Sequence, residues 1–245
     1  MYPSAYDLKD FYNTLGGRIV RTTLRERIAE FWPADEQRDL RMVGIGYALP
    51  YMRPYLDKAE RIVNFMPPQQ GAHPWPMDGQ NLVCLGDEAD LPLETNSVDR
   101  VLLVHALEFS GFYPPLFEEL WRVMKGNARM MIVVPNRMGL WARADWSPFG
   151  QGTPFSASQV ERFLRDNMFS HERTRQGLFI PPFRRDMFLR SAKFFEKTGR
   201  AICPAIGGVH IVEASKQLYA GKGTRARVTS REKMQVVSAI PQPAR

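Results

Sequence analysis

The feature that most constrains the fold is a series of short apolar runs separated by helical segments. The runs that read as strands are LRMVGIG, KAERIVNFM, QNLVCLGD, SVDRVLLVHAL, ARMMIVVPN and GGVHIVEASKQLY. Short runs that are apolar almost throughout are typical of parallel strands covered on both faces. Between them, PPLFEELWRVM and SASQVERFLRDNMF carry apolar residues at helical spacing. This alternation predicts an α/β fold with a doubly wound, mainly parallel sheet.

The two ends of the chain read differently from its centre. Residues 1–33 predict two helices that break at Gly16-Gly17, and we expect one domain over residues 1–220. Residues 172–200 combine paired prolines with a basic amphipathic stretch, and we expect a cap or insertion before the last strand. Residues 221–245 are rich in charge, Gly and Pro without periodicity, which predicts a basic, flexible tail.

The net charge of +7 is concentrated in that tail. From Lys216 onward the chain has seven Lys or Arg residues and one Glu, whereas the preceding 215 residues have 26 basic and 25 acidic residues. A nearly neutral domain weakens the case for a nucleic-acid groove across it. RNA binding through the tail and the Arg162–Arg200 segment stays open as a hypothesis, beside a solvated tail or one that clamps a protein partner.

The sequence lacks signals for a membrane span, for export and for a metal site. No apolar run approaches the ~18 residues of a membrane helix, and the first residues show no signal-peptide core. The two cysteines, Cys84 and Cys203, are far apart and have no CxxC or nearby His partner. We therefore expect a cytoplasmic protein without a membrane contact and without a bound metal.

The ligand crevice of a doubly wound sheet lies at the carboxyl ends of its strands. The residues that follow the apolar runs are therefore the candidates for a site. They are Gly44 to Tyr47, Asn64, Asp87 and Glu88, His105 to Glu108, and Asn136 with Arg137.

The stretch GDEADLPLETNSVDRVLLVHALEFS, followed by LFEELWRVMKGNARMMIVVPNR, resembles the class I S-adenosylmethionine (SAM) methyltransferases of the type 11 group. The resemblance runs from about Leu40 to Asn136. It implies a Rossmann-like sheet of seven strands and in-line methyl transfer from SAM to an acceptor, with S-adenosylhomocysteine (SAH) as product. It gives no identity for the acceptor.

The resemblance also implies roles for individual residues. Gly44, Gly46 and Tyr47 match the glycine loop beside the amino-acid part and ribose of SAM, and Asn64 matches the acid that binds the ribose hydroxyls. Asp87, Glu88 and Ala89 match the turn that faces adenine. His105 matches the loop beside the methionine part, and His105 or Glu108 is a candidate base. Asn136, Arg137 and Trp141 are candidates for substrate contact.

The glycine-rich motif departs from the family pattern. Gly44 stands where the family has an acid, Ala48 and Pro50 stand where it has glycines, and Asn64 stands for Asp or Glu. Asn offers one neutral acceptor where a carboxylate offers two charged ones, which puts about 1–2 kcal/mol of ligand binding at risk. Two hypotheses follow: an active methyltransferase, and a catalytically weakened relative that binds or regulates another protein.

Each candidate also has a structural interpretation. The Gly44 to Gly46 turn could join strand and helix without a ligand; a dinucleotide site is disfavoured because Asn64 stands where that site needs an acid. Asp87 and Glu88 could form a solvated turn, and His105 a satisfied core histidine. Glu108 could brace the following loop, Arg137 could brace residues 172–200, and Trp141 could pack in the core.

Overall fold

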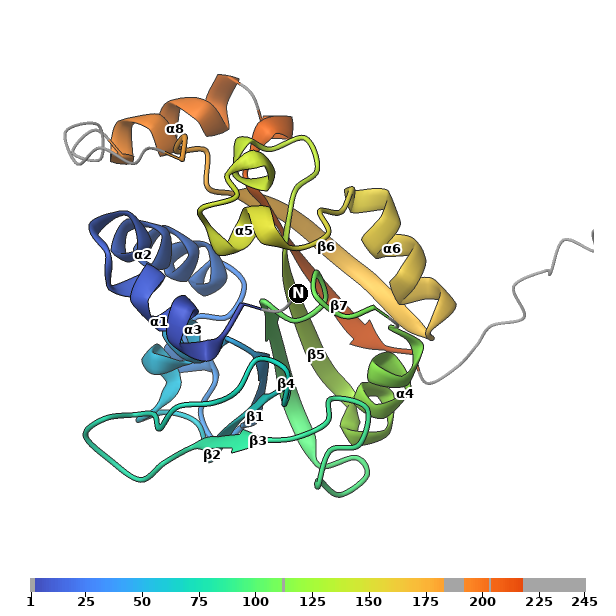
Figure 1. Cartoon of the computed structure of the whole chain (residues 1–245). Coiled ribbons are helices and arrows are strands. Elements are labelled where there is room, and N and C mark those ends of the chain that lie inside the picture. Colours follow the sequence, from blue (N-terminus) through green and yellow to red (C-terminus); the bar gives the residue numbers. More distant parts are fainter. Residues whose placement is uncertain (1–2, 112, 183–191, 203, 218–245) are drawn as a thin grey trace, which may run out of the picture.

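The computed structural model of the chain describes residues 3–111, 113–182, 192–202 and 204–217. Seven strands within these residues form one sheet in the order β3-β2-β1-β4-β5-β7-β6 (Figure 1). The strands are β1 (Arg41–Gly46), β2 (Arg61–Met66), β3 (Val83–Leu85), β4 (Val98–Val104), β5 (Met124–Pro135), β6 (Phe169–Gly177) and β7 (Val209–Lys216). Strands β1 to β5 pair in parallel, and β7 is antiparallel to β5 and β6. The predicted seven-stranded, mainly parallel sheet is confirmed.

The helices lie on both faces of this sheet. They are α1 (Ala5–Asn13), α2 (Leu15–Ala29), α3 (Leu49–Met52), α4 (Pro114–Val123), α5 (Pro148–Gln151), α6 (Ala157–Asp166) and α8 (Ala192–Ile202). Figure 1 shows α1, α2 and α3 on one side, and α4 and α6 on the other. Successive strand residues face opposite sides, so Leu102 packs in the core under α1 and α2 and Leu103 in the core under α4 and α6.

The break between the first two helices lies at Thr14, two residues before the predicted position. Thr14 ends α1 and caps α2, with its hydroxyl accepting from Gly17 N at 3.0 Å. Gly17 lies in the first turn of α2. A Cβ at this position would be 1.9 Å from the carbonyl oxygen of Phe11, so only glycine fits there. The glycines therefore permit a close helix-to-helix approach and do not themselves interrupt the helix.

Local sequence signals are present at the ends of two helices. Pro54 lacks the amide that a continuing helix needs, which predicts that the helix after the glycine turn starts late or kinks. The helix does not start late, because α3 begins at Leu49, but it stops at Met52 and passes into a 3₁₀ turn at Arg53–Tyr55. Ser156 followed three residues later by Gln159 is the sequence pattern of a capping box, and this box is present at the start of α6.

Glu118 and Arg122 are four residues apart in the sequence, a spacing that predicts an ion pair on a helix, but this prediction is wrong. Arg122 instead pairs with Glu119 at 2.6 Å, while Glu118 is exposed. Glu119 faces the Asp87–Ser97 loop, whose carbonyl groups also attract the guanidinium of Arg122. Tertiary contact therefore overrides the helical spacing of the pair.

The segment expected to be a cap, residues 172–200, begins inside the sheet. Residues 172–177 belong to β6, a largely exposed strand whose backbone pairs with β7. Phe194 and Phe195 lie on α8, whereas Met187, Phe188 and the tail at 221–245 fall outside the described residues. The tail's predicted flexibility and its role toward RNA or a protein partner stay predictions.

Candidate functional site

The order in which successive strands are added to the sheet reverses between β1 and β4. Doubly wound sheets bind their ligands at such a switch point. Gly46 ends β1 with a φ of +73°. A Cβ on Gly46 would lie 2.6 Å from the carbonyl oxygen of Val104 and 2.8 Å from that of His105. Tyr47 N donates to the same Val104 oxygen at 2.8 Å. The loops after β1 and β4 thus touch directly, and the requirement for glycine here comes from the protein's own backbone.

Aromatic side chains cover the glycine loop. Tyr47 is 3% exposed, and its ring stacks on that of Tyr12 from α1, with centroids 5.7 Å apart and planes 6° apart. Ala48 and Leu49, which follow in the loop, are buried against the same core. The Tyr47 hydroxyl bonds Nε2 of His73 at 3.1 Å. Two buried and stacked rings, those of Tyr12 and Tyr47, therefore lie at the loop that the resemblance assigns to the methionine part of SAM.

A buried chain of hydrogen bonds runs from α3 to the loop after β4. The Tyr51 hydroxyl donates to that of Tyr12 at 2.8 Å, and Tyr12 lies 2.8 Å from Nε2 of His105. Nδ1 of His105 lies 3.1 Å from Oε1 of Glu108. All four side chains are within 2% of complete burial. His105 adopts a φ of +51°, which turns its ring back toward this network.

The direction of the donors in this network follows from their chemistry. A carboxylate only accepts, so Nδ1 of His105 carries the proton toward Glu108 and Nε2 accepts from Tyr12. Burial, followed by the neighbouring Tyr51, raises the pKa of Tyr12 well above its usual value, so its hydroxyl keeps its proton. Tyr51 donates to Tyr12, Tyr12 to His105, and His105 to Glu108.

Three buried acceptors around Gly46 and His105 have no donor among the described residues. Asn64 donates its amide to Gly46 O at 2.8 Å, which leaves Oδ1 unpartnered. Gln70 donates to His105 O at 3.2 Å, which leaves Oε1 unpartnered, and Oε2 of Glu108 is unpartnered as well. Buried polar atoms are normally satisfied, so this junction is short of hydrogen-bond donors.

Asn64 does not follow its strand, as expected from the sequence, but lies within it. β2 continues two residues further, to Met66, and Asn64 pairs in register with Gly44. Its side chain has no exposed surface. From the sequence, the strand was expected to end before Asn64, because Asn64 is the first polar residue after its apolar run. The strand continues through this position because the buried Asn64 amide donates to Gly46 O. Its role toward a ribose stays a prediction.

The loop after β3 presents the predicted acidic turn. Asp87 is exposed and its Oδ1 accepts from Ala89 N at 2.9 Å. Glu88 is half-buried, and its Oε2 is buried without a partner among the described residues. Burial, assisted by the charge of Asp87, raises the pKa of Glu88 to about 7. Glu88 therefore changes charge near neutral pH.

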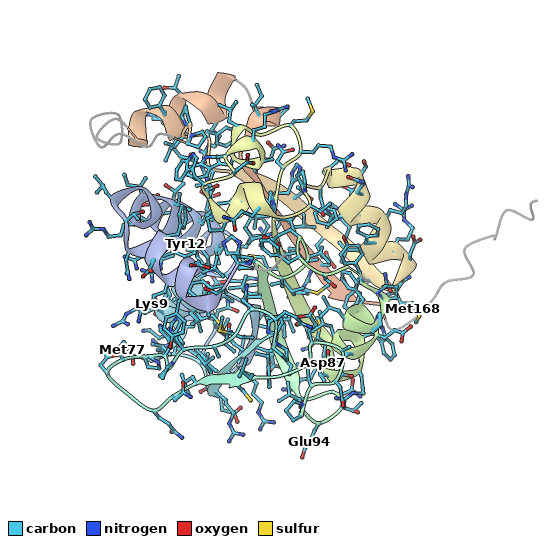
Figure 2. The ribbon with its side chains drawn as sticks, in the orientation of Figure 1. Lys9, Tyr12, Met77, Asp87, Glu94 and Met168 are labelled. Carbon is cyan, nitrogen blue, oxygen red and sulfur yellow. The ribbon has the colours of Figure 1, made fainter. Side chains whose placement is uncertain are left out.

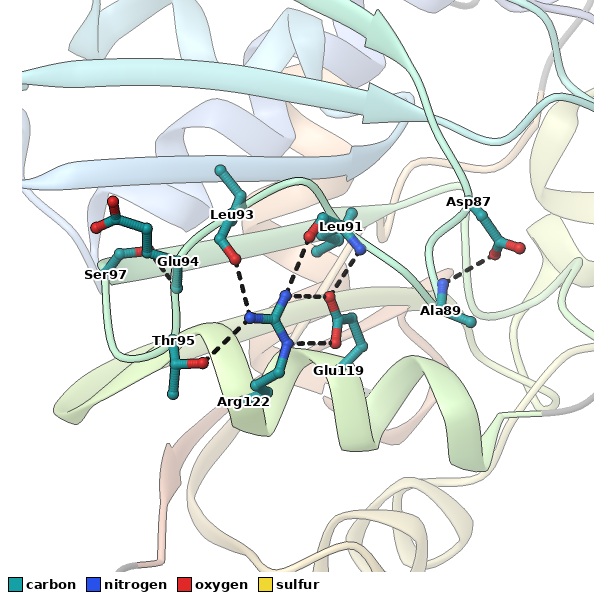
Figure 3. A network of polar contacts seen from close by, with 9 residues as sticks. All are labelled: Asp87, Ala89, Leu91, Leu93, Glu94, Thr95, Ser97, Glu119 and Arg122. Carbon is teal, nitrogen blue, oxygen red and sulfur yellow. Dashed lines mark hydrogen bonds and ion pairs between the residues drawn. The ribbon is translucent and has the colours of Figure 1, made fainter.

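An arginine on α4 fixes the remainder of this loop (Figure 3). Arg122 forms a two-point contact with Glu119, from Nε to Oε2 at 2.8 Å and from Nη2 to Oε1 at 2.6 Å. Its other hydrogens reach the carbonyl oxygens of Leu91 and Leu93, at 3.0 and 2.9 Å. Oε1 of Glu119 accepts from Leu91 N at 2.7 Å. These bonds satisfy the backbone of a loop that has no helix of its own.

The predicted substrate residues lie apart from this network. Asn136 is buried, and its amide donates to the carbonyl oxygens of Ala205 and Gly207 at 3.1 and 2.7 Å. Arg137 is exposed and donates to Pro154 O at 3.4 Å. Trp141 is buried and donates to Ile180 O, and its ring contacts that of Phe149, which in turn contacts His105. Substrate contact by these residues stays a prediction.

The structure thus brings Gly46, Tyr47, Asn64, His105 and Glu108 to one junction. It adds three residues that sequence reasoning missed, namely Tyr12, Tyr51 and Gln70. Tyr12 sits on the apolar face of a short helix, where nothing local distinguishes it from a core residue. Their partners lie far away in sequence, so no motif could have revealed them.

Two kinds of feature are absent from the described part of the chain. No group of three or more His, Cys, Asp or Glu side chains is arranged to hold a metal ion. Among the same residues, no helix has the length and apolar character of a membrane span.

Comparison with known proteins gives a family match and a fold match. Residues 44–132 match the family model described as a methyltransferase domain. No curated protein matches the chain.

Three solved structures illustrate the likeness in fold. One is a Thermotoga maritima SAM-dependent methyltransferase, titled a possible histamine N-methyltransferase, with TM-score 0.57, 15% identity and coverage of 85% of this chain and 94% of that one. Another is the Streptomyces coelicolor geranyl diphosphate C-methyltransferase with SAH, with TM-score 0.52, 13% identity and coverage of 79% and 81%. The [4+2]-cyclase SpnF has TM-score 0.53, 16% identity and 80% coverage of each chain.

Identities this low establish the fold alone, and the cyclase illustrates that one fold serves more than one reaction. The family match adds sequence evidence from Gly44 through β4 into β5. Residues 44–132 are therefore similar to the methyltransferase domain, and the chain has the fold that these solved structures share.

Proposed function

We propose that this protein is a SAM-dependent methyltransferase whose unliganded form is closed by α1. The observation that carries the proposal is the shortage of donors at the junction of Gly46 and His105. Three buried acceptors, on Asn64, Gln70 and Glu108, lie there without partners among the described residues. They belong to a chain whose residues 44–132 match the methyltransferase domain.

The chemistry of SAM suits this set of acceptors. Its ammonium group, ribose hydroxyls and adenine amine are donors, and an unpartnered acceptor gains most from a donor that arrives with a ligand. Oε2 of Glu88, in the acidic turn, is a fourth unpartnered acceptor on the side assigned to adenine. The donor set of SAM therefore fits the residues present, although the space over the loop does not accept it while Tyr12 and Tyr47 stay in place.

Opening requires movement of the first helix. Tyr12 reaches the site from α1, and a rotation of this helix away from Tyr47 would free the glycine loop and break the bond to His105. A binding-competent form that is a minor population weakens apparent affinity in proportion to that population. The closed form therefore predicts modest affinity for SAM.

When bound, SAM supplies a methyl group already activated by its sulfonium, so the protein's task is to align the acceptor and exclude water. His105, held in one tautomer by Glu108, could take a proton from an acceptor once Tyr12 has left Nε2. The acceptor itself is unidentified.

Calorimetric titration of the full chain with SAM and with SAH tests this proposal. We expect heat of binding with the wild type and tighter binding with Tyr12→Ala, because that change removes the ring over the loop. Tyr6→Ala is the matched control, since Tyr6 lies on the same helix and is 59% exposed. Absence of heat at high micromolar ligand from both folded proteins would reject SAM binding.

A second function is favoured by the same packed rings. If Tyr12 and Tyr47 fill the crevice permanently, the protein is a methyltransferase-like binding partner of another protein, without methyl transfer. It then neither binds SAM nor changes its melting temperature with it, and it retains a protein partner in pull-down. Recovery of no partner by the full chain and by a chain lacking residues 221–245 would count against this function.

A further inference from the structure

A cavity, called the second cavity to distinguish it from the proposed SAM site, lies beside the glycine loop. It is between the N-terminal helices and the loop that joins β2 to β3. Its volume is about 240 Å³. Four cations line it, namely Lys9 from α1, Arg21 and Arg25 from α2, and Arg53 after α3. No carboxylate is among its lining residues. Figure 2 labels Lys9 and Tyr12 on α1, and Met77 on the loop of the cavity's other side.

These cations are poorly compensated within the described residues. Arg53 pairs with Asp78 at 3.5 Å, on the exposed rim. Arg25 donates to a backbone carbonyl oxygen, that of Pro50, and forms no ion pair. Arg21 has no partner for its buried Nε. Lys9 likewise has no ion pair among the described residues. The cavity therefore holds about three positive charges that form no ion pair among the described residues.

Without a bound anion, these unpaired cations lower the stability of the folded protein. Arg21 and Arg25 are four residues apart on one helix, where like charges repel. Burial, followed by the charge of Arg21, lowers the pKa of Arg25, and Arg53 adds to this effect. Such repulsion is relieved by an anion, and arginine forks match the geometry of phosphate oxygens.

The cavity also has an apolar part. Leu49, Pro50, Pro74 and Trp75 are among its lining residues, and Trp75 is 9% exposed. Pro74 and Trp75 come from the loop between β2 and β3 and not from the helices that carry the cations. The volume is below the range of about 300–1,000 Å³ that is typical for drug-sized ligands. A ligand that matches both parts has a doubly charged head and a small, uncharged, ring-sized body.

We propose that this cavity is a binding site for a small phosphomonoester, with its phosphate on Arg21, Arg25 and Lys9 and its apolar body against Trp75 and Pro74. The site adjoins the proposed SAM site, but its cations lie on α1, α2 and the turn after α3 and not at the ends of β2 and β4. Its occupant would contact Tyr12 and Tyr47, the two rings that close the glycine loop.

Titration with phenyl phosphate, inorganic phosphate and benzyl alcohol tests the two halves of the site. We expect phenyl phosphate to bind the wild type most tightly, inorganic phosphate more weakly, and benzyl alcohol not at all. Arg21→Gln or Arg25→Gln should each weaken phenyl phosphate binding about tenfold, as expected for the loss of a charged hydrogen bond. Binding of inorganic phosphate and phenyl phosphate with equal affinity would reject the apolar half of the site.

The matched control is Arg18→Gln, which removes one exposed arginine from the same helix outside the cavity. It should change the affinity by less than about twofold, because exposed charges at a distance are screened. Circular dichroism confirms that each variant is folded. The indole N–H resonance of Trp75, assigned with Trp75→Phe, should shift on addition of phenyl phosphate.

Three results would overturn the proposal. One is no binding at about 10 mM phenyl phosphate, weaker than any useful site. Another is equal loss of affinity in Arg18→Gln and Arg21→Gln, which would indicate general charge attraction. The third is displacement of phenyl phosphate by SAM in competition, which would assign the cations to the carboxylate of SAM. Failure of SAM to bind at all rejects the methyltransferase proposal and leaves the phosphate site standing.

Discussion

The hydroxyl of Tyr12 lies 2.8 Å from Nε2 of His105, although 93 residues separate them along the chain. This bond attaches the first helix to the loop after β4. It also places the Tyr12 ring on Tyr47, over the glycine loop. The state of the crevice therefore depends on the attachment of an N-terminal helix that lies outside the region matched to the methyltransferase domain.

Replacing Tyr12 with Phe should destabilise the protein by about 1–3 kcal/mol. The ring stays, but Nε2 of His105 loses its donor and the Tyr51 hydroxyl loses its acceptor in a buried place. Urea unfolding of the wild type and variant measures the difference. Tyr6→Phe, an exposed change on the same helix, should stay within about 0.5 kcal/mol. Equal stability of Tyr12→Phe and wild type would show that the bond contributes nothing.

Gly46 and Gly71 offer a matched pair for the packing of the glycine loop. Their φ angles are +73° and +72°, but a Cβ on Gly46 would meet Val104 O at 2.6 Å and one on Gly71 meets nothing within 4 Å. Gly71→Ala should cost about 1–2 kcal/mol from the left-handed backbone alone. Gly46→Ala should cost about 1–3 kcal/mol more, because its Cβ is overpacked. Similar melting temperatures for the two variants would contradict the contact between the loops.

Arg122→Lys should destabilise the protein by roughly 1 kcal/mol. Lysine keeps the charge but cannot contact both oxygens of Glu119 and the carbonyls of Leu91 and Leu93 together. Glu118→Gln on the same helix is the control, because Glu118 is exposed. Chemical denaturation measures both, and amide exchange of Leu91 should accelerate in Arg122→Lys. Unchanged exchange there would contradict the role of Arg122 in holding the loop.

Glu88 should make stability fall as the pH rises from about 4.5 toward 7. Its folded pKa of about 7 lies above the ordinary value, so the folded protein binds the proton more tightly than the unfolded chain across this range. Glu88→Gln should therefore lose stability less than the wild type between pH 5 and about 7.5. Glu94→Gln, an exposed change on the same loop, should follow the wild-type profile. A Glu88 carboxyl resonance that titrates near its ordinary value would refute this.

The strands and the principal helices were predictable because their signals are local. An apolar run bounded by turn residues indicates a buried strand, Pro54 ends α3 by lacking an amide, and Ser156 with Gln159 caps α6. β6 was missed for the same reason. Its residues are mostly charged and exposed, and only backbone pairing with β7 makes it a strand.

The sequence by itself determined the alternation of strands and helices along the chain apart from β6, and the place of the glycine turn at the end of β1. Only the tertiary structure decided what surrounds that turn. Tyr12, Tyr51 and Gln70 reach His105 from distant segments, and the cations of the second cavity come from two helices and a later turn. Local patterns report which face of an element is apolar, whereas the side chains that meet across elements depend on how those elements pack.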